Sequence, residues 1–174
     1  MELKIIKEIA EKYKKIFEPY CERIEIAGSI RREKLNPNDI EIVAIPKKQN
    51  GRNRTELDVF LENENFDFEK NGRKYKQINL KEKIKLDLFL CQKENWGNIF
   101  LMRTGNWEFN KNLFGFEIKK RGYFSIDGFI LDGLNCRQIN CYEETDVFKL
   151  LGMDYIEPKD REFFYPKTLS KKHT

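Results

Sequence analysis

The sequence predicts an α+β fold, because strand patterns dominate its first half and helical patterns dominate from Trp96 onward. A helix is expected over residues 3–17, where apolar side chains recur at helical spacing between Lys and Glu, and Pro19 marks its end. Residues 23–27 alternate polar and apolar side chains, as a half-buried strand does, and residues 39–45 form a second strand rich in β-branched residues.

The middle of the chain predicts a short helix, a hairpin and another strand. The helix is expected over residues 56–61. The hairpin joins residues 66–69 to residues 74–78 around Asn71-Gly72, a favoured turn sequence. The strand covers residues 84–90 and carries an acidic residue at its centre.

The second half predicts mainly helices. A short helix is expected over residues 96–102, followed by a break at Thr104-Gly105 and a longer helix over residues 107–120 that ends at Gly122. The remaining expected elements are short strands at residues 123–129 and 130–133 and a last helix at residues 143–151.

Composition describes a globular chain with a heavily charged surface. Its 174 residues suit one compact domain or two closely packed subdomains, and its net charge of +4 permits a polyanionic partner without requiring one. The four cysteines form no C-x-x-C pair, and the single histidine, His173, lies in the tail, so zinc, disulfide and histidine chemistry are not favoured. No apolar run approaches about 18 residues and no signal peptide is present, so we expect a soluble, cytoplasmic protein that is not secreted.

Acidic residues that suit a metal lie at the start of the second expected strand. The chain reads Asp39-Ile40-Glu41 there, and residues i and i+2 of a strand point to the same side, so Asp39 and Glu41 project next to each other. Two carboxylates this close repel unless a proton or a cation lies between them. Hard oxygen ligands at this spacing suit Mg²⁺. Asp87, at the centre of an apolar strand, is the expected third carboxylate.

A candidate phosphate cradle precedes these carboxylates in the chain. It is the segment Gly-Ser-Ile-Arg-Arg-Glu at residues 28–33. The Gly28-Ser29 turn is small enough for its backbone N–H groups to approach a phosphate, and Arg31 and Arg32 add positive charge beside it. A phosphate cradle followed by metal-binding carboxylates indicates nucleotidyl transfer.

The order of these motifs resembles that of the family X DNA polymerases, typified by the DNA polymerase beta type. The shared pattern is Gly-Ser-x-Arg-Arg, Asp-x-Glu, Leu-Asp-Leu-Phe and Thr-Gly-Asn-Trp-Glu-Phe-Asn-Lys-Asn, and it continues to the closing turn at residues 157–161. The resemblance covers about residues 22–163. The glycine–serine and carboxylate part marks only the wider nucleotidyltransferase superfamily, whereas the part from Thr104 to Arg161 indicates family X.

The resemblance implies two subdomains. Residues 1–95 would form a nucleotidyltransferase palm, a mixed sheet with helices packed on one side, and residues 96–174 a smaller C-terminal α/β subdomain that closes on the nucleotide. The lyase domain and the helix-hairpin-helix modules of larger members have no counterpart in this sequence, as in minimal members of the family.

The resemblance also implies roles for particular residues. Asp39, Glu41 and Asp87 would hold two Mg²⁺ ions, with Mn²⁺ as a substitute, for the addition of deoxynucleotides from dNTPs to a primer 3′-hydroxyl. The nucleotide would contact Gly28, Ser29, Arg32, Thr104, Gly105 and Asn110. Trp107 stands where the family usually has a smaller residue, and we expect it to stack on the incoming base. The DNA contacts implied are Lys85, Lys119, Lys120 and Arg121. The expected partners are gapped or primer–template DNA and dNTPs, bound by a monomer without a membrane.

Three departures from the family pattern keep other functions open. Glu41 replaces the usual second aspartate, Met102-Arg103 replaces an aromatic pair that excludes ribonucleotides, and Phe114 replaces an arginine that senses the template strand. The leading hypothesis is short gap filling in DNA repair. The alternatives are a template-independent or non-DNA nucleotidyltransferase, acting on RNA 3′ ends or on protein or small-molecule hydroxyls, and a non-catalytic nucleic-acid-binding module.

Overall fold

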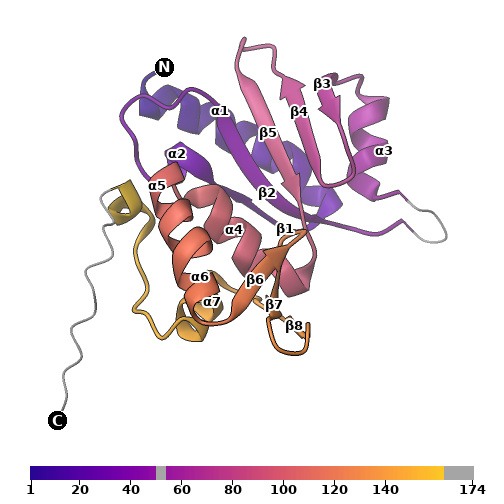
Figure 1. Cartoon of the computed structure of the whole chain (residues 1–174). Coiled ribbons are helices and arrows are strands. Elements are labelled where there is room, and N and C mark those ends of the chain that lie inside the picture. The colour runs from indigo at the N-terminus through magenta and orange to yellow at the C-terminus, as the bar shows by residue number, and fades with distance from the viewer. Residues whose placement is uncertain (50–53, 163–174) are drawn as a thin grey trace.

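The predicted α+β fold is confirmed. The computed structural model describes residues 1–49 and 54–162, so the last part of the expected second subdomain, residues 163–174, lies outside the described residues. A five-stranded sheet with helices is followed by further helices and a three-stranded sheet (Figure 1). None of the helices in the described ranges is both long enough and apolar enough to cross a membrane.

The larger sheet is mixed. Its strand order is β1-β2-β5-β4-β3, where β2 and β5 pair in parallel and all other neighbours pair antiparallel. The hairpin predicted around Asn71-Gly72 is confirmed as β3 and β4. The strands are β1 (Cys21–Ile26), β2 (Ile40–Pro46), β3 (Asp67–Asn71), β4 (Tyr75–Asn79) and β5 (Lys85–Leu90).

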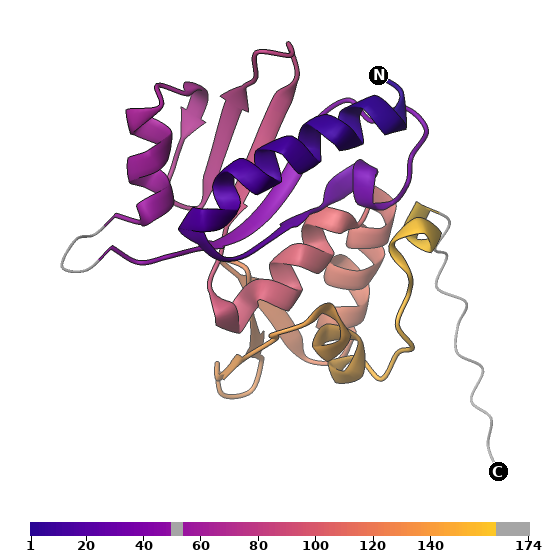
Figure 2. The same ribbon diagram turned by 180° about the vertical axis from the view of Figure 1, so that it is seen from behind.

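Two helices cover one face of this sheet. Figure 2 shows α1 (Leu3–Phe17) lying across the strands, with α3 (Glu56–Asn63) beside it. The predicted apolar pattern of α1 packs on the sheet because its side chains share one stripe. Ile5 is the exception, since it remains 47% exposed. The buried members from α1 are Ile6, Ala10, Tyr13 and Phe17.

A one-turn helix, α2 (Gly28–Arg31), joins β1 to the loop before β2. The sequence of residues 29–35, between the first two expected strands, predicts a short helix, but the observed helix begins at Gly28 and already ends at Arg31. Glu33 adopts φ +59°, a left-handed conformation that ends right-handed helical geometry. The chain therefore turns directly toward Asp39, which lies immediately before β2.

The second half begins with α4 (Trp96–Thr104), which packs on the opposite face of the larger sheet from α1. Trp96 and Phe100 of α4 form a buried cluster with Val43, Ile45 and Phe89 of the sheet. Glu41 shares the face of Val43 because the two residues are two positions apart on β2. The predicted carboxylates therefore lie on the side of the sheet that meets α4.

The long helix predicted after α4 is confirmed as a continuous helical segment with a π-helical middle. It runs through α5 (Trp107–Asn110), the π-helical residues Lys111–Glu117 and α6 (Ile118–Lys120). Gly122 follows with φ +77°, the left-handed conformation expected where a helix ends at glycine.

The rest of the described chain completes the second half of the structure with a small sheet, a helix and a 3₁₀ turn. The small sheet has the order β6-β7-β8, and α7 (Glu144–Leu150) packs beside α4. The strands are β6 (Tyr123–Ile126), β7 (Phe129–Asp132) and β8 (Gln138–Ile139), and short 3₁₀ turns lie at Glu18–Tyr20, Lys93–Asn95 and Pro158–Glu162. The division into subdomains at residues 95 and 96 stays a prediction.

Candidate functional site

Two of the predicted carboxylates lie on neighbouring parallel strands. Glu41 of β2 and Asp87 of β5 are direct register partners, and Asp39 precedes Glu41 by two positions. Burial, and then the charge of Asp87, raises the pKa of Asp39. Burial, and then the charge of Asp39, raises the pKa of Glu41 to about 7. The three carboxyl groups thus repel one another, which favours a proton or a cation among them.

The carboxylate of Glu41 lies against the start of α2. Gly28 has φ +64°, and a Cβ atom on it would come within 2.0 Å of Glu41 Oε2. The backbone N–H of Ala27 donates to the carbonyl of Glu41 at 2.8 Å, which holds the two segments together. Glycine is therefore needed at position 28 both for its backbone conformation and for the space that Glu41 fills.

The carboxylate of Asp87 is held on the other side, by β4. The hydroxyl of Tyr75 and the amide Nε2 of Gln77 each donate to Asp87 Oδ1 at 2.8 Å. Burial, and then the hydrogen bond to Asp87, raises the pKa of Tyr75 to about 12, so the phenol keeps its proton and acts as a donor. Sequence reasoning missed Tyr75 and Gln77, because their role depends on the strand register.

The chemistry of the three carboxylates suits a divalent cation, but the present positions of their side chains do not. The three carboxylates are hard oxygen ligands of the kind that Mg²⁺ uses, and burial together with the charge of a neighbouring carboxylate raises the pKa of Asp39 and that of Glu41. Glu41 nevertheless leans toward α2, and Asp87 is bonded to β4. Across residues 1–49 and 54–162, no group of three or more acidic, His or Cys side chains is gathered closely enough to bind a metal ion. The carboxylates would have to converge for a metal to bind.

One cation from α4 reaches this acidic region. The guanidinium of Arg103 lies over the ring of Phe89, with its Cζ 3.9 Å from the ring centroid. Its charge opposes the rise in the pKa of Glu41. Within the described chain, Arg103 Nε is buried without a hydrogen-bond partner. The sequence signal for Arg103 was its departure from the family's aromatic pair, but that signal predicted only altered sugar selection.

The predicted triphosphate-binding residues are only partly free to bind a ligand. Arg32 donates through Nε to Glu162 at 2.6 Å and through NH1 to the carbonyl of Thr104 at 2.7 Å. The hydroxyl of Ser29 is buried and has no hydrogen-bond partner within the described residues. Ser29 therefore has unused hydrogen-bonding capacity at the glycine–serine turn, whereas Arg32 would have to exchange partners to bind phosphate.

A buried charge network ties α2 to α7. Arg31 donates two hydrogen bonds to the carboxylate of Glu144, at 2.7 and 2.8 Å, and one to Thr104 Oγ1 at 2.8 Å. Arg161 donates two more to the same carboxylate, at 2.8 and 3.2 Å, and the hydroxyl of Tyr155 donates one at 2.9 Å. Burial raises the pKa of Glu144, but these hydrogen bonds outweigh it and hold that pKa at about 2. Sequence reasoning missed this network because it joins residues far apart in the chain.

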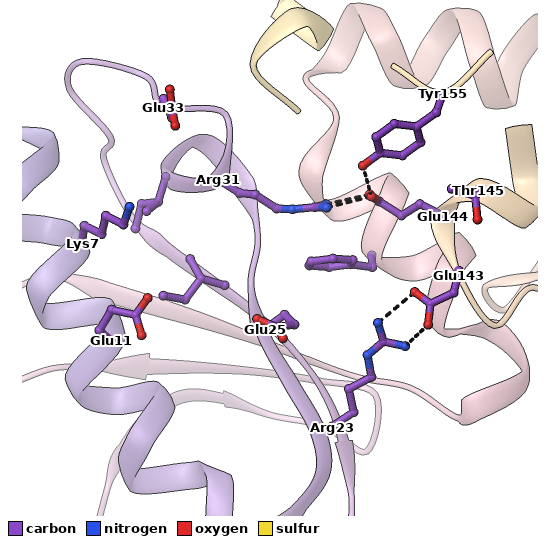
Figure 3. Close-up of a pocket in the computed structure, with 13 residues that line it drawn as sticks. Lys7, Glu11, Arg23, Glu25, Arg31, Glu33, Glu143, Glu144, Thr145 and Tyr155 are labelled. Atoms are coloured by element: carbon purple, nitrogen blue, oxygen red, sulfur yellow. Dashed lines mark hydrogen bonds and ion pairs between the residues drawn. The ribbon is translucent and has the colours of Figure 1, made fainter. Parts of the chain in front are cut away.

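A cavity of about 580 Å³ lies between α1, α2 and α7. Figure 3 shows two ion pairs along its wall, Arg31 with Glu144 and Arg23 with Glu143. The three predicted metal ligands do not line it. The cavity therefore lies between the first half of the chain, with α1 and α2, and the second half, with α7. It is separate from the carboxylate site.

The predicted sugar and base contacts do come together, at the end of α4. Asn110 donates through Nδ2 to the carbonyl of Met102 at 2.8 Å and to that of Gly105 at 3.3 Å. A Cβ atom on Gly105 would come within 2.4 Å of Asn110 Oδ1, so this turn also requires glycine. Thr104 is fully buried. Trp107, by contrast, is 71% exposed and contacts Lys111, whose Nζ lies 4.8 Å from the ring centroid.

The predicted DNA contacts belong to two elements that lie apart in Figure 1, β5 of the larger sheet and α6 of the second half. Lys85 begins β5 and pairs with Glu69 at 2.6 Å. Lys119, Lys120 and Arg121 lie at the end of α6, where the two lysines are exposed and Arg121 pairs with Glu117. The structure therefore does not bring the two groups together.

Comparison with known families concerns the second half of the chain. Residues 99–162 match the family model of the DNA polymerase beta thumb. The match begins inside α4 and ends at Glu162, so it contains Thr104 and Glu144 but none of the three carboxylates. No curated protein is found to be similar to the chain. The resemblance to DNA polymerase beta is thus supported over residues 99–162.

Proposed function

We propose that the protein is a metal-dependent nucleotidyltransferase of the DNA polymerase beta type, which extends a primer 3′-hydroxyl from dNTPs in short gaps. One observation carries the proposal. Arg31 and Arg32, which follow the glycine–serine turn, both donate to Thr104 of the segment that matches the polymerase thumb. These contacts support the proposal that the turn beside Glu41 and the segment expected to hold the nucleotide form one site.

The proposed roles follow from the contacts. Asp39, Glu41 and Asp87 would hold two Mg²⁺ ions, or Mn²⁺ in their place. The bound ions would supply charge neutralisation at the triphosphate and a lower pKa at the primer hydroxyl. The Ser29 hydroxyl, buried without a partner, suits a phosphate oxygen. Arg32 would leave Glu162 to bind the same phosphates.

The sugar and base would lie over the turn that follows α4. Gly105 leaves no space for a side chain there, and Asn110 holds the turn through its amide. The exposed indole of Trp107 offers a flat surface for stacking on a base. DNA would contact Lys85 of the proposed palm, which comprises residues 1–95. It would also contact Lys119–Arg121 of the proposed closing subdomain.

Primer extension tests this function. A labelled primer in a one-nucleotide gap, on a recessed template and as a single strand would receive Mg²⁺ or Mn²⁺ and dNTPs. We expect templated extension of the gap, and its loss in Asp39→Ala and Asp87→Asn. The matched control is Asp67→Asn. Asp67 is an exposed acidic residue of the same sheet, and its carboxylate accepts a hydrogen bond from the side-chain amide of Asn79. No extension of any substrate by the natural protein, or full activity of Asp87→Asn, would refute the proposal.

Template-independent transfer is the second candidate, and Phe114 favours it. Its partly buried ring packs against the apolar cluster of the second half, so this position presents no charged group to a template strand. Extension of single strands irrespective of the template base would identify this activity. Extension that follows the template base would exclude it.

A further inference from the structure

The carboxylate of Asp87 is bonded to two side chains outside the nucleotidyltransferase motifs. Gln77 is its direct partner on the neighbouring strand, and Tyr75 lies two positions along β4, so all three project from the same face of the sheet. Both donors reach the same oxygen, Oδ1, at 2.8 Å. Within the described residues, the other oxygen, Oδ2, accepts no hydrogen bond.

The two donors are themselves fixed. The ring of Tyr75 stacks on the ring of Phe89 with a centroid separation of 5.1 Å and an interplanar angle of 19°. Phe89 is buried and carries the guanidinium of Arg103 on its ring. The phenol of Tyr75 is therefore held by packing, and it donates from a defined position.

From this geometry we infer that Tyr75 and Gln77 are positioning residues for Asp87. By fixing Oδ1, they would limit rotation of the carboxylate and leave Oδ2 as the oxygen that binds the metal when Asp39 and Glu41 converge on it. Hydrogen bonds to a ligating carboxylate from outside the ligand set tune metal affinity in this way. The inference rests on the proposed function, because it takes Asp87 as a metal ligand.

The same hydrogen bonds could instead oppose metal binding, and that role predicts the opposite change in metal affinity. If Tyr75 and Gln77 kept Asp87 away from Glu41, they would compete with the metal. Their removal would then tighten metal binding. A positioning role requires that their removal weakens metal binding.

Binding of Mn²⁺ to the protein alone separates these cases. The variants are Tyr75→Phe, which keeps the stacked ring, and Gln77→Met, which keeps the side-chain length. Free Mn²⁺ would be counted by electron paramagnetic resonance during titration. We expect each variant to weaken Mn²⁺ binding by about tenfold, within the range of 10- to 100-fold known for such outer contacts. We also expect primer extension to return to the natural kcat at saturating Mn²⁺.

Tyr13→Phe is the matched control. It removes a tyrosine hydroxyl that donates to Glu82 at 2.9 Å, a bond of the same kind made by α1 on the other face of the sheet. Its Mn²⁺ affinity should equal that of the natural protein. A loss of affinity in this control equal to that in Tyr75→Phe would overturn the inference, because the effect would then be general.

Asp87→Asn distinguishes failure of this inference from failure of the proposed function. If the natural protein and Asp87→Asn bind Mn²⁺ equally weakly, the metal site itself is refuted, and the inference with it. If Asp87→Asn loses Mn²⁺ but Tyr75→Phe and Gln77→Met bind it as tightly as the natural protein or more tightly, only the positioning role is refuted. Weaker binding in all three variants supports both.

Discussion

Replacement of Glu144 by glutamine should destabilise the protein more than the same replacement of its neighbour Glu143. Glu144 is 5% exposed, and its carboxylate receives hydrogen bonds from Arg31, Arg161 and Tyr155. The substitution keeps the shape of the side chain but removes the negative charge. Two arginines, one of them fully buried, would then face each other without a counter-charge.

The size of the loss follows from the pKa. Glu144 ionises at about 2 in the folded protein against an ordinary value of 4.5, and at about 1.4 kcal/mol per pH unit this difference contributes about 3 kcal/mol. Breaking a buried ion pair costs a similar amount, about 3 to 5 kcal/mol. Because the folded pKa is depressed, this stability is complete above pH 4.5 and is lost as the pH falls toward 2.

Urea unfolding of the natural protein and Glu144→Gln at several pH values measures the effect. At pH 7 we expect the variant to lose about 3 kcal/mol of unfolding free energy and about 10 °C in Tm. The difference between the two proteins should shrink below pH 4.5. The matched control is Glu143→Gln, because Glu143 also pairs with an arginine through two hydrogen bonds but its side chain is 53% exposed. Its loss should stay below about 1 kcal/mol. Equal losses in the two variants, or a difference that does not change with pH, would refute the reasoning.

Two further substitutions test the glycine–serine turn and the exposed indole. Gly28→Ala should lower the unfolding free energy by about 1 to 3 kcal/mol and reduce primer extension, because the new Cβ would overlap Glu41 Oε2 and the position has φ +64°. An alanine variant with natural stability in urea and natural activity would contradict this reading of the turn. Trp107→Ala should leave Tm within about 2 °C, because the side chain is 71% exposed, while KM for the nucleotide rises several-fold. A natural KM in that variant would exclude base stacking.

Elements defined by local patterns could be predicted from the sequence. The stripe of α1, the Asn71-Gly72 hairpin and the glycine after the long helix each depend on residues a few positions apart. In all three, the local preference agrees with the packing in the structure. The closeness of Asp39 to Glu41, whose pKa it raises, agrees with the two-residue period of a strand, although β2 itself begins one residue later, at Ile40. The α+β class follows from the same signals.

Features that depend on distant contacts could not be predicted. Arg31 reaches Glu144 across 113 positions of sequence, and no local pattern distinguishes this glutamate from a solvated one at the start of a helix. Tyr75 and Gln77 meet Asp87 only through the register of β4 on β5. The early end of α2 depends on the left-handed conformation of Glu33, a residue type with no special preference for it.

The apolar contact between α4 and the larger sheet limits how the two halves move. Trp96 and Phe100 are buried against Val43 and Phe89, and exposure of each such large side chain costs about 1.5 to 3 kcal/mol. An opening movement that separates α4 from the strands would therefore have a high free-energy cost. Small sliding of α4 over the sheet keeps these side chains covered. Any adjustment that admits a ligand between Thr104 and the carboxylates should accordingly be a shear movement, with α4 as the moving layer.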